Sequence, residues 1–240
     1  MDNNSISFQE LDWDTEFFGV TCAKTVLHHS LNKSDWNKLK LKFKDYEFIS
    51  IVNKNSEPMN AQLIGKETSA FLADVNIQFV KKIDGNVTFP QNITSIGLSQ
   101  RDLHQLMDLA DFKYSKFVED PELARRGGSY VYREWLRNSF KNPEKYFVIS
   151  KDNSGSINGF ALYSITNNKC VIELIAVSQL NSNAGIGSSL FQAVEYNVFQ
   201  KGIQKIVVGT QLRNLSAVNF YYKVGCKQVG CHQVYHLWNI

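Results

Sequence analysis

A single charge interrupts an apolar run in the C-terminal half of the chain. The segment CVIELIAV, residues 170–177, carries only Glu173, and a run of this kind predicts a central strand covered on both faces. A carboxylate buried in such a strand is costly unless it is paired or used. We therefore expect Glu173 to have either a chemical or a positioning task.

Two glycines follow this strand and precede a predicted helix. In SQLNSNAGIGSSLFQAVEYNVFQKG, Gly185 and Gly187 lead into an amphipathic pattern with Leu190, Val194 and Val198 at four-residue spacing. Glycines let the backbone approach a ligand, and the free N–H groups at a helix start favour a phosphate. The pattern indicates a pyrophosphate site, although an ordinary tight turn would need the same glycines.

A second segment places three residues on one helical face. After the predicted strand KIVVGTQ at 205–211, Asn214 can cap a helix on which Ala217 and Tyr221 follow three and seven residues later. Gly225 is placed to end that helix. The alternatives are that Asn214 is only a cap and that Tyr221 only packs the helix against the sheet.

These two motifs, in this order, resemble the GNAT superfamily of acetyl-CoA-dependent acyltransferases. The resemblance covers about residues 100–240, with Asn214 to Gly225 matching an N-x-x-A-x-x-F/L-Y-x-K-x-G ending. It implies acetyl-CoA as cofactor and Tyr221 as the acid that protonates the departing sulfur. A phenol, with an ordinary pKa near 10, is competent for that task.

The same resemblance implies the cofactor contacts. The strand backbone near Ile175 to Val177 is expected to pair with the pantetheine arm and to supply a donor for the developing oxyanion. Where the family usually has Gln or Arg before its glycine loop this chain has Ser182, and an Arg-Gly pair is replaced by Asn183 and Ala184, but backbone donors at 184–189 remain. The expected cofactor-binding residues are Ile175, Ala176, Val177, Asn183, Ala184, Gly185, Ile186, Gly187, Ser188, Asn214, Ala217 and Tyr221.

A narrower resemblance lies in LDWDTEFFG at 11–19, YSKFVEDP at 114–121 and YREW at 132–135. These segments look like the bacterial TDP-fucosamine N-acetyltransferase family, which acetylates the 4-amino group of TDP-4-amino-4,6-dideoxy-D-galactose. The resemblance implies a nucleotide-sugar substrate, a homodimeric habit, and Lys116 where many relatives have Arg. Packing of Phe17, Phe18 and Trp135 in the core is the alternative. The implied substrate-binding residues are Phe17, Tyr114, Lys116, Phe117, Tyr132 and Glu173.

The role of Glu173 stays open at this point. An amine attacks a thioester only when it is neutral, so a group must accept its proton, and Glu173 is a candidate base, directly or through water. The alternative, of equal weight, is that Glu173 orients the sugar or caps a neighbouring loop.

Composition bears on binding to nucleic acids, membranes and metals, and on the location of the protein. The 26 basic and 23 acidic residues give a formal charge of +3 without a basic block, so we expect no nucleic-acid partner. No apolar run approaches the roughly 20 residues of a membrane span, and the start MDNNSISFQELDWD is acidic, so we expect a cytoplasmic protein without a signal peptide. The four cysteines form no C-x-x-C pair and the five histidines match no zinc motif, so we expect no metal.

The order of elements predicts an α/β (α+β) fold. Residues 1–95 mix predicted strands at 48–53 and 76–83 with a helix at 34–46 capped by Ser34, and suggest a small N-terminal domain. Residues 96–240, with a hairpin of 146–150 and 157–165, correspond to an acetyltransferase domain with a mixed sheet flanked by helices. The proline- and glycine-containing stretch 85–94 supplies the boundary.

Two other functions compete with the nucleotide-sugar interpretation. One is a GNAT enzyme that acetylates a protein, a peptide or another small amine, and the other is a non-catalytic CoA-binding domain. The aromatic N-terminal segments oppose the first, and Tyr221 opposes the second, because binding alone has no use for a leaving-group acid. The identity of the amino sugar, the nucleotide base and the length of the acyl group are not fixed by the sequence.

Overall fold

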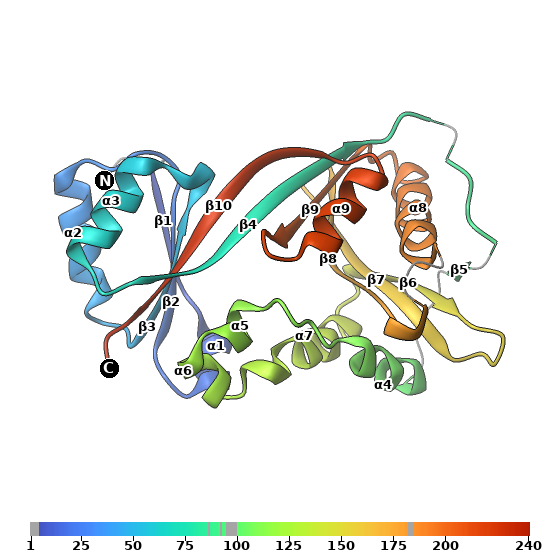
Figure 1. Ribbon diagram of the computed structural model, residues 1–240, viewed down its shortest axis with the longest axis horizontal. Coiled ribbons are helices and arrows are strands. Elements are labelled where there is room, and N and C mark those ends of the chain that lie inside the picture. Colours follow the sequence, from blue (N-terminus) through green and yellow to red (C-terminus); the bar gives the residue numbers. More distant parts are fainter. Residues whose placement is uncertain (1–4, 86, 92, 95–99, 182–184) are drawn as a thin grey trace.

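A computed structural model describes residues 5–85, 87–91, 93–94, 100–181 and 185–240. Their strands form one ten-stranded mixed sheet in the order β1-β2-β3-β10-β4-β9-β8-β7-β6-β5, which Figure 1 shows as a long twisted surface. The strands are β1 Ile6–Glu10, β2 Cys22–Leu27, β3 Phe48–Asn53, β4 Phe71–Lys82, β5 Ile93–Thr94, β6 Lys145–Lys151, β7 Ile157–Thr166, β8 Lys169–Val177, β9 Lys205–Gln211 and β10 Lys227–Trp238.

Helices cover the sheet in groups. In Figure 1, α2 and α3 lie beside β1 to β3, while α8 and α4 lie at the other end of the molecule. The α-helices are α1 Asp12–Phe18, α2 Lys33–Phe43, α3 Pro58–Glu67, α4 Gln100–Leu109, α5 Lys116–Glu119, α6 Pro121–Arg125, α7 Val131–Phe140, α8 Ile186–Phe199 and α9 Leu215–Lys223. Short 3-10 turns are η1 Lys54–Ser56, η2 Gly128–Tyr130 and η3 Gln179–Asn181. In the described part of the chain, no helix combines the length and apolarity needed to cross a bilayer.

The two longest strands, β4 and β10, tie the halves of the molecule together. They pair antiparallel with each other, while β10 also pairs with β3 and β4 with β9. The hydrophobic cores under α8 and α2 therefore each contain residues from both halves of the sequence. Ile77 and Phe79 of β4 pack in the core under α8, whereas Tyr235 and Leu237 of β10 pack in the core under α2. A division at residue 95 therefore coincides with no break in the sheet or in the cores.

Local signals placed most elements correctly. The predicted strands at 48–53 and 205–211 and the hairpin of 146–150 with 157–165 are confirmed, with Val148 opposite Ala161. The N-cap predicted at Ser34 is wrong. The N-cap lies two residues earlier, at Asn32, whose side-chain oxygen accepts a hydrogen bond from the backbone N–H of Asp35 at 2.9 Å.

Strand β8 is covered on both faces, as predicted, with one irregularity. Ile172 packs in the core under α8, and Leu174 packs in the core under α4 and α7. The register against β7 shifts between these two residues. Glu173 is thus the extra residue of a β-bulge, which redirects the residues that follow it.

Candidate active site

The end of β8 separates from its parallel neighbour β9. The described pairing runs only from Cys170 to Ile172, opposite Ile206 to Val208. Beyond it, Ile175, Ala176 and Val177 stay paired with β7 on the other side and line a cavity. Their backbone groups on the β9 side are therefore available to an extended ligand. This is the strand end at which the sequence predicted cofactor pairing and an oxyanion donor.

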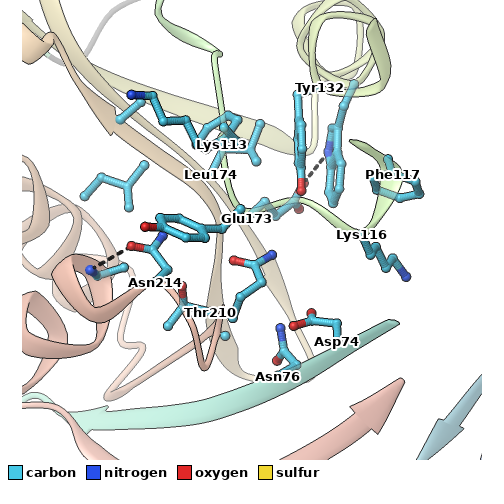
Figure 2. Close-up of a pocket in the computed structure, with 18 of the residues that line it drawn as sticks. Asp74, Asn76, Lys113, Lys116, Phe117, Tyr132, Glu173, Leu174, Thr210 and Asn214 are labelled. Carbon is cyan, nitrogen blue, oxygen red and sulfur yellow. Dashed lines mark hydrogen bonds between the residues drawn. The ribbon is translucent and has the colours of Figure 1, made fainter. Parts of the chain in front are cut away.

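Helix α9 begins beside this gap. The Asn214 side-chain oxygen accepts a hydrogen bond from the Ala217 N–H at 3.1 Å, which confirms the predicted cap. Asn214, Ala217 and Tyr221 all line the cavity, and Figure 2 shows Asn214 beside it. The positive φ of 84° at Gly225 lies just past the helix end, as predicted.

Tyr221 combines burial with a position on the cavity wall. Only 3% of the residue is exposed, and its ring packs 5.4 Å from that of Phe79 and 5.2 Å from that of Phe220. Burial raises the pKa of the phenol above its ordinary value. Tyr221 is therefore protonated near neutral pH and can donate a proton to a group in the cavity.

The start of α8 supplies the predicted glycine loop in part. Gly185 has a left-handed φ of 81°, a conformation that favours glycine, and no atom lies within 4 Å of the position that a Cβ would take. A Cβ on Gly187 would lie 3.2 Å from the ring of Phe220, so this glycine allows α8 and α9 to approach. Ile186 is buried in the core, and Ser188 is half-buried in the first turn. The predicted contacts Asn183 and Ala184 lie outside the described residues.

Glu173 is held by donors from three elements. Its side chain, 8% exposed, forms an ion pair with Lys145 and accepts hydrogen bonds from the Ser164 hydroxyl at 2.5 Å and from the Trp135 indole N–H at 3.1 Å. Trp135 in turn stacks on Tyr132, with ring centroids 6.2 Å apart and planes 10° apart. Both carboxylate oxygens are thus engaged, and one of the bonds fixes an aromatic wall of the cavity.

A cavity of about 970 Å³ joins these groups to the N-terminal strands. Glu173 lines it, together with four more of the predicted substrate residues, Tyr114, Lys116, Phe117 and Tyr132. Figure 2 shows Lys116 and Phe117 on one side of this space and Tyr132 near Glu173. The sixth, Phe17, is not among the lining residues. It stacks on Trp13 at 4.8 Å, in agreement with the alternative of a packing role.

Three charged residues that the sequence analysis did not assign to the site lie in the cavity with the predicted Lys116. Asp14, Lys24 and Asp74 line the cavity with Lys116. Burial raises the pKa of Asp74 to about 6 and that of Asp14 above its ordinary range, and burial lowers the pKa of Lys116 to about 8. No local motif connects residues so distant in sequence. A perturbed set of this kind inside a cavity is typical of a binding site.

The match to a known family covers the region that builds this site. Residues 103–226 match the acetyltransferase (GNAT) family, and they include β8, the start of α8, β9 and α9. The chain belongs to this family. The fold and the recognition predicted from the two motifs are therefore confirmed.

Two curated relatives come from Bacillus subtilis (strain 168). One is named spore coat polysaccharide biosynthesis protein SpsD and is 26% identical over 140 residues, which are 57% of this chain and 48% of that protein. The other is the uncharacterized protein YdhI, which is 31% identical over 117 residues, or 49% of this chain and 65% of YdhI. The matches thus span about half to two thirds of these relatives.

Solved structures share the fold over almost the whole chain. A GCN5-related N-acetyltransferase from Sphaerobacter thermophilus superposes with a TM-score of 0.68 at 13% identity, covering 98% of this chain and 76% of that one. A functionally unknown conserved protein from Staphylococcus epidermidis gives 0.70 at 12% identity, with 100% and 93% covered. At these identities the similarity shows the architecture, including the N-terminal strands, and no more.

The cofactor of the family is acetyl-CoA, and the residues present fit it. The matched region is that of an acetyl-CoA-dependent acetyltransferase. The unpaired edge of β8 suits the amides of a pantetheine arm, and the first N–H groups of α8, which have no partner within a helix, suit phosphate oxygens. Gly185 keeps that helix start free of side-chain bulk. When bound, acetyl-CoA supplies the acetyl group as a thioester.

Proposed function

We propose that the protein transfers an acetyl group from acetyl-CoA to the amino group of a TDP-linked 4-amino-4,6-dideoxyhexose. The observation that carries this proposal is the single cavity that runs from β8 and Tyr221 to the N-terminal strands. Its volume of about 970 Å³ lies at the upper end of the range for small-molecule sites. The thioester end of acetyl-CoA takes the part of the cavity beside β8 and Tyr221. The part that continues to β3 and β10 lies beyond the reach of a simple amine and can take a sugar joined to a nucleotide. The printed name of SpsD, a polysaccharide biosynthesis protein, supports a sugar acceptor.

In this reaction Tyr221 acts as the general acid. The neutral amine attacks the thioester carbonyl, whose oxygen gains negative charge as the carbon–nitrogen bond forms and loses it as the carbon–sulfur bond breaks. Backbone N–H groups of Ile175 to Val177 on the free edge of β8 are the donors for that oxygen. The phenol of Tyr221, which burial keeps protonated, donates its proton to the departing sulfur. The proton that the attacking nitrogen loses passes through water to the Tyr221 oxygen, which restores the acid.

Glu173 has a positioning task in this proposal. To accept a proton it would have to release its ion pair with Lys145 or a hydrogen bond from Ser164 or Trp135. Its bond to Trp135 instead orients the aromatic wall formed with Tyr132. Of the two roles left open by the sequence, these contacts favour orientation of the acceptor.

Release of CoA thiol tests the proposal. Purified protein is given acetyl-CoA with TDP-4-amino-4,6-dideoxy-D-galactose, with the corresponding TDP-6-deoxyhexose that lacks the amine, or with no acceptor. We expect rapid release only with the amino sugar and a product heavier by one acetyl group. Release at the same rate without the amine, or no release although acetyl-CoA binds, would contradict the proposed acceptor and favour another amine or the non-catalytic alternative.

A further inference from the structure

Two buried polar side chains lie side by side on β3 and β10, at the end of the cavity that the N-terminal strands line. Ser50 on β3 lies directly opposite His236 on β10 in their antiparallel register. Residues opposite each other in such a pair point to the same face, with Cβ atoms about 5 Å apart. Both residues line the cavity, as do Phe48 and Val52 at alternate positions of β3 and Val234 of β10. The polar pair therefore belongs to the floor of the cavity.

Within the described part of the chain, neither the Ser50 hydroxyl nor the Nε2 atom of His236 has a hydrogen-bond partner. Ser50 is 4% exposed and His236 is fully buried. Buried polar atoms are normally hydrogen-bonded, so a buried polar atom without a partner in the protein indicates that another molecule supplies one. Since both atoms belong to residues of the cavity floor, a ligand in the cavity can supply that partner.

Asp120 fixes the chemistry that His236 presents. The Oδ2 atom of Asp120 accepts hydrogen bonds from His236 Nδ1 at 2.6 Å and from the Trp238 indole N–H at 3.0 Å. Although burial opposes its ionisation, these bonds hold the pKa of Asp120 below its ordinary value, and burial lowers the pKa of His236. The imidazole is therefore neutral with its proton on Nδ1, which leaves Nε2 as a hydrogen-bond acceptor.

The pair lies far from the reacting end of the cavity. From β8 to β10 the sheet crosses β9 and β4, about 14 Å at ordinary strand spacing. His236 lies four residues along β10 from His232, which is at the level of Asn76 and Gln211, a further ~13 Å. A distance of roughly 20 Å excludes direct proton transfer between His236 and an amine beside β8.

We propose that Ser50 and His236 anchor the end of the acceptor remote from the reacting amine, with His236 Nε2 accepting from a ligand donor and the Ser50 hydroxyl bonding an adjacent polar atom. This inference rests on the proposed function and adds where the acceptor is held. A pyrimidine imide edge, at the nucleotide end of such an acceptor, presents an N–H beside carbonyl oxygens. The ring of Phe48, 4.9 Å from that of His236, adds an apolar surface beside the pair.

Steady-state kinetics of Ser50→Ala and His236→Gln test the anchor. One lost hydrogen bond predicts a three- to tenfold rise in the KM of TDP-4-amino-4,6-dideoxy-D-galactose for Ser50→Ala, and about tenfold for His236→Gln, with kcat and the KM of acetyl-CoA unchanged. Matched controls are Ser139→Ala, a buried serine of α7 outside the cavity lining, and His29→Gln, an exposed histidine. An unchanged acceptor KM in Ser50→Ala and His236→Gln would overturn the anchor.

A truncated acceptor identifies the donor group. With the free 4-amino-4,6-dideoxy sugar, a KM equal in all variants places the anchored donor on the nucleotide part, as a distance of roughly 20 Å from the reacting amine requires. A rise in the KM of the free sugar in Ser50→Ala and His236→Gln would overturn the remote anchor.

Calorimetric measurement of TDP binding tests the anchor independently of acetyl transfer. If the unsubstituted protein does not acetylate the amino sugar but binds TDP more tightly than Ser50→Ala and His236→Gln do, the reaction is wrong and the anchor stands. If it neither turns over the amino sugar nor binds TDP, both are overturned.

Discussion

Replacing Asp74 with asparagine should stabilise the protein at neutral pH and have little effect in acid. Burial raises the pKa of this carboxyl from 3.8 to about 6, so the folded protein binds more protons than the unfolded chain between these values. The stability associated with the protonated form is present below pH 4 and is lost as pH rises through 6. At about 1.4 kcal/mol per tenfold change in proton affinity, the loss is at most about 3 kcal/mol. Partial exposure to solvent reduces the expected gain in Asp74→Asn to about 1–2 kcal/mol at pH 7.5.

The assay is urea unfolding followed by circular dichroism at pH 4.5 and pH 7.5. The difference in unfolding free energy between Asp74→Asn and the unsubstituted protein should grow by about 1 kcal/mol between these two pH values. Asp45→Asn removes an exposed carboxylate as the control, and should change stability by no more than about 0.5 kcal/mol. An Asp74→Asn protein that is less stable at pH 7.5 than at pH 4.5, relative to the unsubstituted protein, would refute burial as the dominant influence on Asp74.

Three further substitutions separate the roles within the site. Tyr221→Phe keeps the ring packing and should lower kcat by about 10²- to 10⁴-fold at unchanged acetyl-CoA affinity, measured by thiol release and calorimetry; unchanged turnover would exclude the acid role. Glu173→Gln should raise the acceptor KM and leave kcat within about tenfold, whereas a loss of kcat alone would indicate a base. Asn214→Ala removes the cap of α9 and should cost about 1 kcal/mol in urea unfolding, and full stability would show that the cap bond is not needed.

The elements of the C-terminal half could be predicted from the sequence because short runs of adjacent residues determine them. An apolar run predicts a strand such as β8, Asn214 caps the helix that begins beside it, and Gly225 ends that helix, so each element can be identified from a few adjacent residues. The pairing of the strands is not local. The sequences of β4 and β10 do not reveal that β10 pairs with β3 of the N-terminal half and β4 with β9 of the C-terminal half. Both strands carry alternating patterns that fit either core.

The same reasoning separates the parts of the site that were predicted from those that were missed. Tyr221 and the backbone at Ile175 belong to motifs of a dozen residues or fewer, and the fold brings them to one cavity. Asp74 was missed, and it meets the predicted Lys116 there only because β4 crosses between the two halves. Their perturbed pKa values result from tertiary burial, which no sequence window contains.

Ser50 and His236 lie opposite each other only in one strand register, which the sequence does not reveal. The two residues are far apart in sequence, and neither belongs to a motif; a one-residue slip of β10 against β3 would turn His236 to the opposite face. The carboxylate that sets its tautomer comes from Asp120, whose other oxygen caps α6 by accepting from the N–H groups of Glu122 and Leu123. One side chain thus starts a helix and directs a histidine on a distant strand. Asp120→Asn should therefore lose acceptor affinity as well as stability, whereas a helix cap alone would account only for the second.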